Sequence, residues 1–133
     1  MIYLWDTDTY SAWERAPQLF TRRLGRLAGE DVVALSAVTV YEVVRGRTAA
    51  VAQSRDEPTY ARRLATLVAT MTALRRWPIV PYTAGAAERM ADLRRGRWNR
   101  GRGDLRIAAT ALTAGATLVT RNERDFSDLP GLK

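Results

Sequence analysis

Three short apolar runs, separated by longer stretches with helical periodicity, are the feature that most constrains how this chain can fold. The runs are MIYLW at residues 1–5, VVALS at 32–36 and TLVT at 117–120. Each run is short and stops at polar residues, which is typical of a buried strand rather than a helix. A weaker fourth candidate is WPIVPY at 77–82. Buried strands that alternate with helices favour a parallel sheet, so we predict the α/β fold class.

The stretches between the runs predict helices. One apolar stripe with the spacing of a helix face begins after a candidate N-cap, Ser36, and consists of Ala37, Val40, Tyr41 and Val44. A similar stripe follows Asp104 and consists of Ile107, Ala108, Ala111 and Leu112. Further helices are expected at 16–28, 57–76 and 84–95, and a linker rich in Gly and Arg at 96–103.

The composition limits both the fold and the chemistry. At 133 residues, 47% of them hydrophobic, the chain is long enough for one compact domain, residues 1–133, with a real core. It contains no signal-peptide pattern and no apolar run long enough to cross a bilayer, so we expect a cytoplasmic protein without membrane contact. The absence of cysteine and histidine excludes disulfides, thiolate nucleophiles, histidine bases and metal sites built from these residues.

Four polar residues, far apart in the sequence, map to one edge of the predicted sheet. Asp6 follows the first strand directly, and Asn122 follows the strand at 117–120. Glu42 lies in the helix after the second strand, and Asp104 lies at the start of the helix that leads into the last strand. Ligands of open α/β sheets bind outside the carboxyl ends of the strands, so we expect a site there.

A site with several carboxylates needs a positive charge. Two unit charges about 4 Å apart repel each other by roughly 4 kcal/mol at an effective dielectric constant near 20. Oxygen ligands without His or Cys select Mg²⁺ or Mn²⁺, which can activate water and shield a phosphate. The net charge of +7 favours an anionic partner such as nucleic acid.

Each of these residues also has a simpler interpretation. Asp6 also fits a turn or a helix cap, although its position at the end of a strand favours the site. Glu42 lies off the apolar stripe, and such a residue is usually only solvated. The helix dipole favours Asp104 in a first helical turn whatever its role. Asn122 and Asp125 are equally compatible with a C-terminal turn.

Residues 89–106 are rich in arginine. Such a run usually forms only a solvated helix or loop face. Here the flanking Trp98, the nearby glycines and Asp104 also fit a loop that grips phosphates. The candidates for RNA contact are Arg95, Arg97, Arg100 and Arg102.

Three blocks of sequence resemble the PIN-domain ribonuclease toxins of the VapC type. They are LWDTD at 4–8, LSAVTVYEVVRG at 35–46 and GDLRIAATALTAGATLVTRNERDFSDLPGL at 103–132. The resemblance implies a three-layer α/β/α domain with a central parallel sheet of four to five strands. It also implies an endoribonuclease that depends on Mg²⁺ or Mn²⁺, a cognate VapB-type antitoxin and a homodimer.

The same resemblance assigns roles to individual residues. Asp6, Glu42 and Asp104 match the family's metal-binding and catalytic acids. Asn122 stands at the family's fourth acidic position, with Asp125 nearby in support, and Thr120 matches a hydroxyl that often lies beside the metal.

The chain departs from the family at its first motif. The family usually has Asp-Thr-Asn there, whereas this chain has Asp6, Thr7 and Asp8. Thr7 and Asp8 are therefore supporting candidates. Asp8 is expected either to face the metal as a further carboxylate or to cap the next helix.

The leading interpretation is hydrolysis of RNA phosphodiester bonds by the toxin of a VapBC-type pair. A PIN-type RNA-processing nuclease outside toxin–antitoxin systems would use the same chemistry. A non-catalytic nucleic-acid-binding protein would use only the basic surface, and it would gain nothing from clustered carboxylates.

Overall fold

A central parallel sheet organises the chain. A computed structural model describes residues 1–96 and 101–133. The strands β1 (Ile2–Trp5), β2 (Val32–Ser36), β3 (Ile79–Val80) and β4 (Thr117–Val119) lie in the order β3-β2-β1-β4, and every neighbouring pair is parallel. All four apolar runs therefore form strands as predicted, although the fourth is only two residues long.

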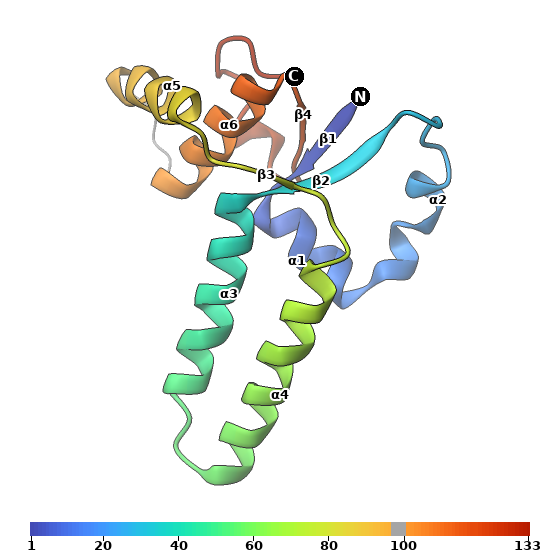
Figure 1. The fold of residues 1–133 in the computed structure, drawn as a ribbon, viewed down its shortest axis with the longest axis vertical. Helices are drawn as coiled ribbons and strands as arrows, with labels where there is room; N and C mark the ends of the chain where they lie inside the picture. The colour runs from blue at the N-terminus through green and yellow to red at the C-terminus, as the bar shows by residue number, and fades with distance from the viewer. Residues whose placement is uncertain (97–100) are drawn as a thin grey trace.

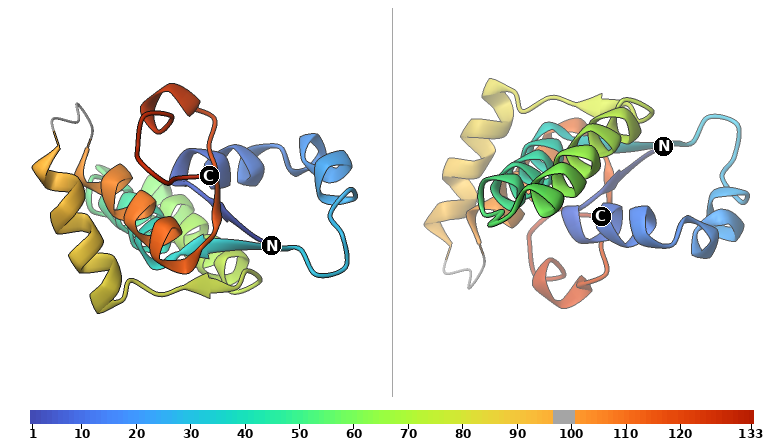
Figure 2. Two further views of the ribbon diagram at one scale, coloured as in Figure 1. Left: turned by 90° about the horizontal axis from the view of Figure 1, so that it is seen from above. Right: turned by 90° about the horizontal axis from the view of Figure 1, so that it is seen from below.

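Helices cover both faces of this sheet. One face carries α5 (Ala84–Arg95) and α6 (Arg102–Ala114), which pack with Leu4, Ala34 and Leu118 in one apolar cluster. The other face packs through Trp5, Val33 and Leu35 against α1 (Thr7–Arg15) and the neighbouring helices. Figure 2 shows the α5–α6 pair and α1 on opposite sides of the strands. The predicted three-layer α/β/α architecture is confirmed.

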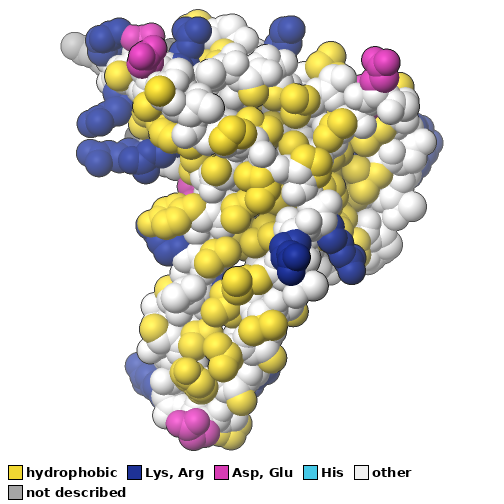
Figure 3. Space-filling view, viewed as in Figure 1, with side chains coloured by type: hydrophobic (Ala, Val, Ile, Leu, Met, Phe, Trp, Pro, Cys, Tyr) yellow, Lys and Arg dark blue, Asp and Glu magenta, His cyan; other side chains and the backbone are white. Residues whose placement is uncertain are grey.

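A helical hairpin extends away from the sheet. It consists of α3 (Ala37–Ala52) and α4 (Glu57–Leu74), which run side by side (Figure 1). Its surface carries exposed apolar side chains, namely Tyr41, Tyr60, Leu64, Val68 and Met71, and Figure 3 shows the hydrophobic surface that runs along both helices. In the described parts of the chain, neither these nor any other helix is long and apolar enough to span a membrane.

Side-chain caps fix where most helices begin. Asp6, Ser36, Asp56 and Thr83 each accept a hydrogen bond from the backbone N–H three residues later. Such caps satisfy amides that have no partner within the helix. The predicted helices at 57–76 and 84–95 are confirmed within two residues. The helix predicted after Ser36 is also confirmed, and it ends at Ala52, a bound that had not been predicted.

Two predictions about helices were wrong. The region 16–28 does not form one helix, but a 3₁₀ turn at Pro17–Leu19 and the short α2 at Thr21–Leu24. Pro17 has no N–H to continue α1, and Ala16 leaves the helical region with φ −149° and ψ 67°. The second error is Tyr41, which is 60% exposed rather than part of the core face of its helix. In α3 the adjacent face is buried instead, through Val38, Thr39 and Val43.

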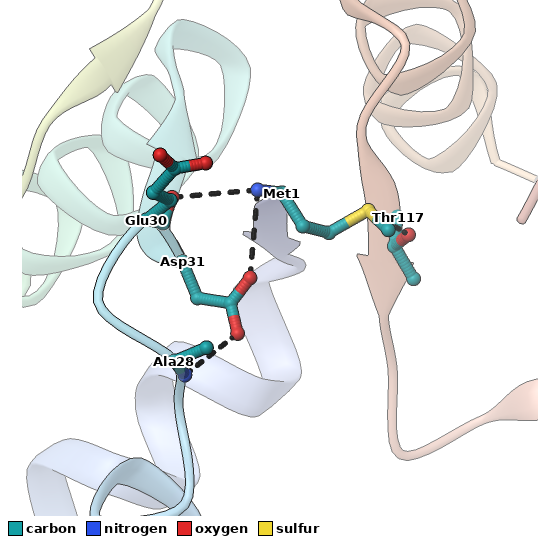
Figure 4. A network of polar contacts seen from close by, with 5 residues as sticks. All are labelled: Met1, Ala28, Glu30, Asp31 and Thr117. Carbon is teal, nitrogen blue, oxygen red and sulfur yellow. Dashed lines mark hydrogen bonds and ion pairs between the residues drawn. The ribbon is translucent and has the colours of Figure 1, made fainter.

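A small polar network fixes the start of β1 (Figure 4). The N-terminal ammonium of Met1 lies 3.4 Å from Oδ1 of Asp31, and it donates a hydrogen bond to the backbone oxygen of Glu30 over 3.4 Å. Oδ2 of Asp31 accepts from the backbone N–H of Ala28 over 2.9 Å. On the other side, the hydroxyl of Thr117 contacts the sulfur of Met1 at 3.4 Å. These contacts tie the start of β1 to the chain before β2 and to β4, in line with the register in which Trp5 pairs with Leu35 and Val119.

Candidate active site

Asp6 lies directly after β1, at the carboxyl edge of the sheet, and only 4% of it is exposed. Its Oδ1 accepts a hydrogen bond from the backbone N–H of Thr9 over 2.7 Å, so it is the N-cap of α1. Its own backbone N–H donates to the carbonyl of Val119 at the end of β4 over 3.2 Å. The cap interpretation is therefore correct, but it accounts for one carboxylate oxygen only. Among the described residues, no hydrogen bond reaches the other.

Glu42 reaches the same edge from the second turn of α3. Its Oε2 accepts a hydrogen bond from the hydroxyl of Thr7 over 2.7 Å. The other carboxylate oxygen lies against Gly103, where a Cβ atom would collide with it. Three elements thus meet at one carboxylate: the start of α1, α3 and the start of α6. Glu42 is half-buried, so the interpretation of a merely solvated surface residue does not describe its surroundings.

Asp104 lies in the first turn of α6 and is half-buried. Burial raises the pKa of this carboxyl above its usual value, because the charged form loses water contacts. Nearby negative charges raise the pKa further, in decreasing order those of Glu42, Asp125, Asp6 and Asp8. The negative charges that act on Asp104 therefore come from three separate segments of the chain: the start of α1, α3 and the turn that contains Asp125.

The C-terminal candidates form a turn beside this group. The backbone N–H of Asn122 donates to the hydroxyl of Thr120 over 2.9 Å, and its side-chain amide donates to Oδ2 of Asp125. Asn122 is exposed, so the turn interpretation is correct for it. Asp125 fits both the turn and the site interpretation. It accepts a hydrogen bond within the turn, and its charge also acts on Asp104.

Asp8 is exposed in the first turn of α1. Of the two alternatives for Asp8, the helix cap is wrong, because Asp6 is the cap. Its charge contributes least among the four acids that raise the pKa of Asp104.

A cleft of about 810 Å³ opens beside Glu42 and Asp104. Besides these acids, its lining includes Tyr41, Arg45, Tyr82, Arg102 and Arg106. Of the predicted RNA-contact residues, only Arg102 is found there. Arg95 points instead to an ion pair with Asp92, and Arg97 and Arg100 lie outside the described residues.

Sequence reasoning missed Tyr41 and Arg45 as site residues. Both are exposed, and the Arg45 guanidinium carbon lies 5.9 Å from the centre of the Tyr41 ring. The signal was available, because the two residues flank Glu42 one position before and three positions after it on the same helix. Tyr41 was missed because it had been assigned to the apolar face of its helix.

The chemistry of the donor set decides which cofactor the site can hold. As they stand, no three acidic side chains among residues 1–96 and 101–133 come together closely enough to enclose one ion. The donors are nonetheless all oxygens, and the repulsion that raises the pKa of Asp104 is the kind that a hard divalent cation relieves. The residues fit Mg²⁺ or Mn²⁺ in type, and binding of one ion by three of them would require their side chains to move closer together.

Comparison with known proteins gives consistent matches along the chain. The sequence model of the PIN domain matches residues 3–132. Ribonuclease VapC2 of Rickettsia felis is 28% identical over 137 residues, which cover 99% of this chain and 95% of that protein.

Solved structures with the same fold include VapBC2 from Rickettsia felis bound to a DNA fragment from its promoter. The likeness has a TM-score of 0.73 at 27% identity and covers 99% of this chain and 96% of that one. FitAcB from Neisseria gonorrhoeae has a TM-score of 0.67 at 28% identity and covers 96% and 91%. VapBC-1 from nontypeable Haemophilus influenzae, with a TM-score of 0.76 at 22% identity over 100% and 96%, shares the fold. All the residues of the cleft fall within the matched region.

Proposed function

Since this chain belongs to the PIN domain family, we propose that it is a metal-dependent endoribonuclease and the toxin of a VapBC-type toxin–antitoxin pair. The observation that carries the proposal is that the charges of Glu42 and Asp6 both act on Asp104 at the carboxyl edge of the sheet, and that Glu42 and Asp104 line a cleft bordered by arginines. Withdrawing a carboxylate from water is costly, and acids that are buried or half-buried beside one another in a cleft are typical of functional sites.

Asp6, Glu42 and Asp104 are the residues that would hold Mg²⁺ or Mn²⁺. When bound, such an ion acidifies water and neutralises charge that develops on the phosphate. The protein's own contribution is to fix the three carboxylates in place. The N-cap bond holds Asp6, the Thr7 hydroxyl holds Glu42, and the first turn of α6 holds Asp104.

The remaining candidates support the site from outside the group of three acids. Asn122 and Thr120 order the turn that carries Asp125, and Asp125 adds negative charge near Asp104. Asp8 adds a weaker charge of the same sign. Arg102 at the rim of the cleft is suited to hold the RNA backbone.

The partner proposal rests on relatives and on an exposed surface. The similar solved structures include VapBC assemblies, and we assign this chain a VapB-type antitoxin and a homodimer. The exposed apolar side chains of Leu64, Val68 and Met71 on α4 are a surface that protein contacts would cover.

The experiment is cleavage of a panel of structured RNAs with Mg²⁺, with Mn²⁺ and with a chelator, with the cleavage positions mapped at both ends. Three variants test the site: Asp6→Asn, Glu42→Gln and Asp104→Asn. Glu88→Gln is the matched control, because Glu88 is an exposed acid on α5. We expect each site variant to lose about a hundredfold or more in cleavage, since each removes one charge from a shared ion site.

Two outcomes would redirect the proposal. If metal has no effect and the three variants bind RNA more tightly than wild type, the chain is a non-catalytic nucleic-acid-binding protein. If cleavage depends on metal but no small antitoxin gene adjoins this one and co-expression finds no inhibitor, the enzyme belongs to RNA processing instead.

A further inference from the structure

Tyr41 is an aromatic side chain without a place in the core. It is 60% exposed and lies in the wall of the cleft next to Glu42 in the sequence. The ring is not part of the buried face of α3, which consists of Val38, Thr39 and Val43. A ring beside the acids is therefore available to a ligand.

The positive charges around the ring are also available. Arg45 stacks near the Tyr41 ring, and Arg102 and Arg106 line the cleft from α6. Within residues 1–96 and 101–133, none of the three forms an ion pair with a carboxylate. All three are exposed, so they can meet phosphates without first giving up a partner.

The Tyr41 ring, the Arg45 guanidinium and the carboxylates of Glu42 and Asp104 line the same cleft. The cleft of about 810 Å³ lies within the usual range of ligand-binding clefts, roughly 300 to 1,000 Å³. Aromatic rings and arginine planes are the groups on which unpaired bases stack, whereas paired bases cannot leave their helix to do so without a cost of a few kcal/mol. Phosphate contacts alone would not explain an aromatic residue at this position.

We propose that Tyr41 and Arg45 form a platform for one unpaired base next to the phosphate that is cleaved, and that Arg102 and Arg106 hold the adjoining backbone. This inference rests on the proposed ribonuclease function and assigns the contact with the base to two residues of this chain, Tyr41 and Arg45. The base stacks on the Tyr41 ring and the Arg45 plane, which places its phosphate against Glu42 and Asp104.

The test measures binding separately from cleavage. The protein carries Asp104→Asn to prevent turnover, and the probes are a fluorescein-labelled single-stranded RNA of mixed sequence and the same strand annealed to its complement. Tyr41→Ala should weaken binding of the single strand about tenfold, since stacking of one base accounts for roughly 5- to 150-fold in Kd. Binding of the duplex should change little.

Two matched variants sharpen this test. Tyr41→Phe keeps the ring and should bind like the parent, and Tyr60→Ala removes a tyrosine that is 43% exposed on α4, away from the cleft, and should have no effect. The double variant Arg102→Ala, Arg106→Ala should lower the slope of log Kd against log salt by about 1.4, since each phosphate contact on a single strand contributes about 0.7. The double variant Arg22→Ala, Arg26→Ala makes the same charge change on exposed residues that do not line the cleft, and it should lower the slope less.

The outcomes separate this inference from the proposed function. Unchanged single-strand binding by Tyr41→Ala, or an equal loss in Tyr41→Phe, overturns the platform even if the wild type cleaves RNA. A change of oligomeric state in Tyr41→Ala, seen by light scattering, also overturns it, because the ring would then belong to a protein interface. If the platform variants behave as expected but the wild type cleaves no RNA with any divalent ion, the ribonuclease proposal fails and the binding site stands.

Discussion

The hydroxyl of Thr7 donates a hydrogen bond to Oε2 of Glu42 over 2.7 Å, across 35 residues of sequence. Thr7 follows Asp6 directly, so this bond fixes the distance between two of the proposed metal ligands. Thr7→Val has nearly the same volume but no donor, and we expect it to raise the Mg²⁺ concentration needed for half-maximal cleavage about tenfold, since one hydrogen bond to a charged group is worth roughly 1.5 kcal/mol. Thr7→Ser keeps the hydroxyl and should restore the wild-type titration. Equal curves for Val and Ser would remove this bond from the site.

Gly103 leaves room for the Glu42 carboxylate, and a methyl group there would displace it. Because the displaced atoms are the end of a flexible side chain, Gly103→Ala should not destabilise the fold. It should instead raise the free energy of unfolding by up to about 1 kcal/mol, since Ala favours helices over Gly. We expect cleavage to fall at least tenfold. Urea unfolding and initial cleavage rates, measured on the same preparation, check both statements.

Gly46 provides the control for this variant. It also lies within a helix, α3, but a Cβ there meets no atom within 4 Å. Gly46→Ala should raise stability by a similar amount and leave cleavage unchanged. If Gly103→Ala cleaves as fast as Gly46→Ala, the close approach to Glu42 has no role in catalysis.

Asp104→Asn should stabilise the metal-free protein at neutral pH. The pKa of Asp104 is raised in the folded state, by burial first and then by the neighbouring acids. Between the unfolded and folded pKa values the folded protein holds more protons, so wild-type stability falls as the pH rises through this window. Asn does not ionise, so the two proteins should differ least near pH 4 and most near pH 7, as measured by urea unfolding with a chelator present. A stability difference that does not change with pH would contradict the repulsion among the acids.

Asp8→Asn tests the chain's own departure from the family motif. Asp8 is exposed and contributes least of the four acids to the raised pKa of Asp104. We therefore expect the Mg²⁺ titration of cleavage to shift by only about two- to threefold, as is usual for an exposed charge. Asp6→Asn should shift it far more. Superimposable curves for wild type and Asp8→Asn would show that Asp8 has no effect on the ion.

The sequence predicted which residues lie at the carboxyl edge of the sheet. It did not predict which face of α3 is buried. Asp6 follows a short apolar run directly, and parallel strands place their carboxyl ends together whatever the details of packing. For α3 the pattern shows which residues share a face, but apolar residues occur on two adjacent faces. Val38 and Val43 pack inward, while Tyr41 faces the cleft. Tertiary packing determines which of the two faces is buried, and the position of Tyr41 in the cleft wall depends on this.

Local breaks in the chain were harder still to predict. The sequence at 16–28 has enough helix-forming residues for one helix, but the non-helical backbone at Ala16 and the 3₁₀ turn that begins at Pro17 leave only the short α2. Likewise, the close approach of Gly103 to Glu42 joins two segments that share no local pattern. Such contacts follow from the order of the strands rather than from any window of sequence.

Tyr10 makes stability depend on pH through a side chain that is not one of the candidate site residues. It is fully buried, and its hydroxyl has no hydrogen-bond partner among the described residues. Tyr10→Phe removes only this unpaired group, so we expect the free energy of unfolding to rise by about 1 kcal/mol.

Burial, followed by the charge of Glu14, raises the pKa of Tyr10 to about 12. Since an unfolded tyrosine ionises near pH 10, wild-type stability should fall between pH 10 and 12 relative to Tyr10→Phe, which has no such group to ionise. Urea unfolding of both proteins at pH 8 and pH 11 measures this difference, and a wild type that is the more stable protein at either pH would mean that the hydroxyl is satisfied.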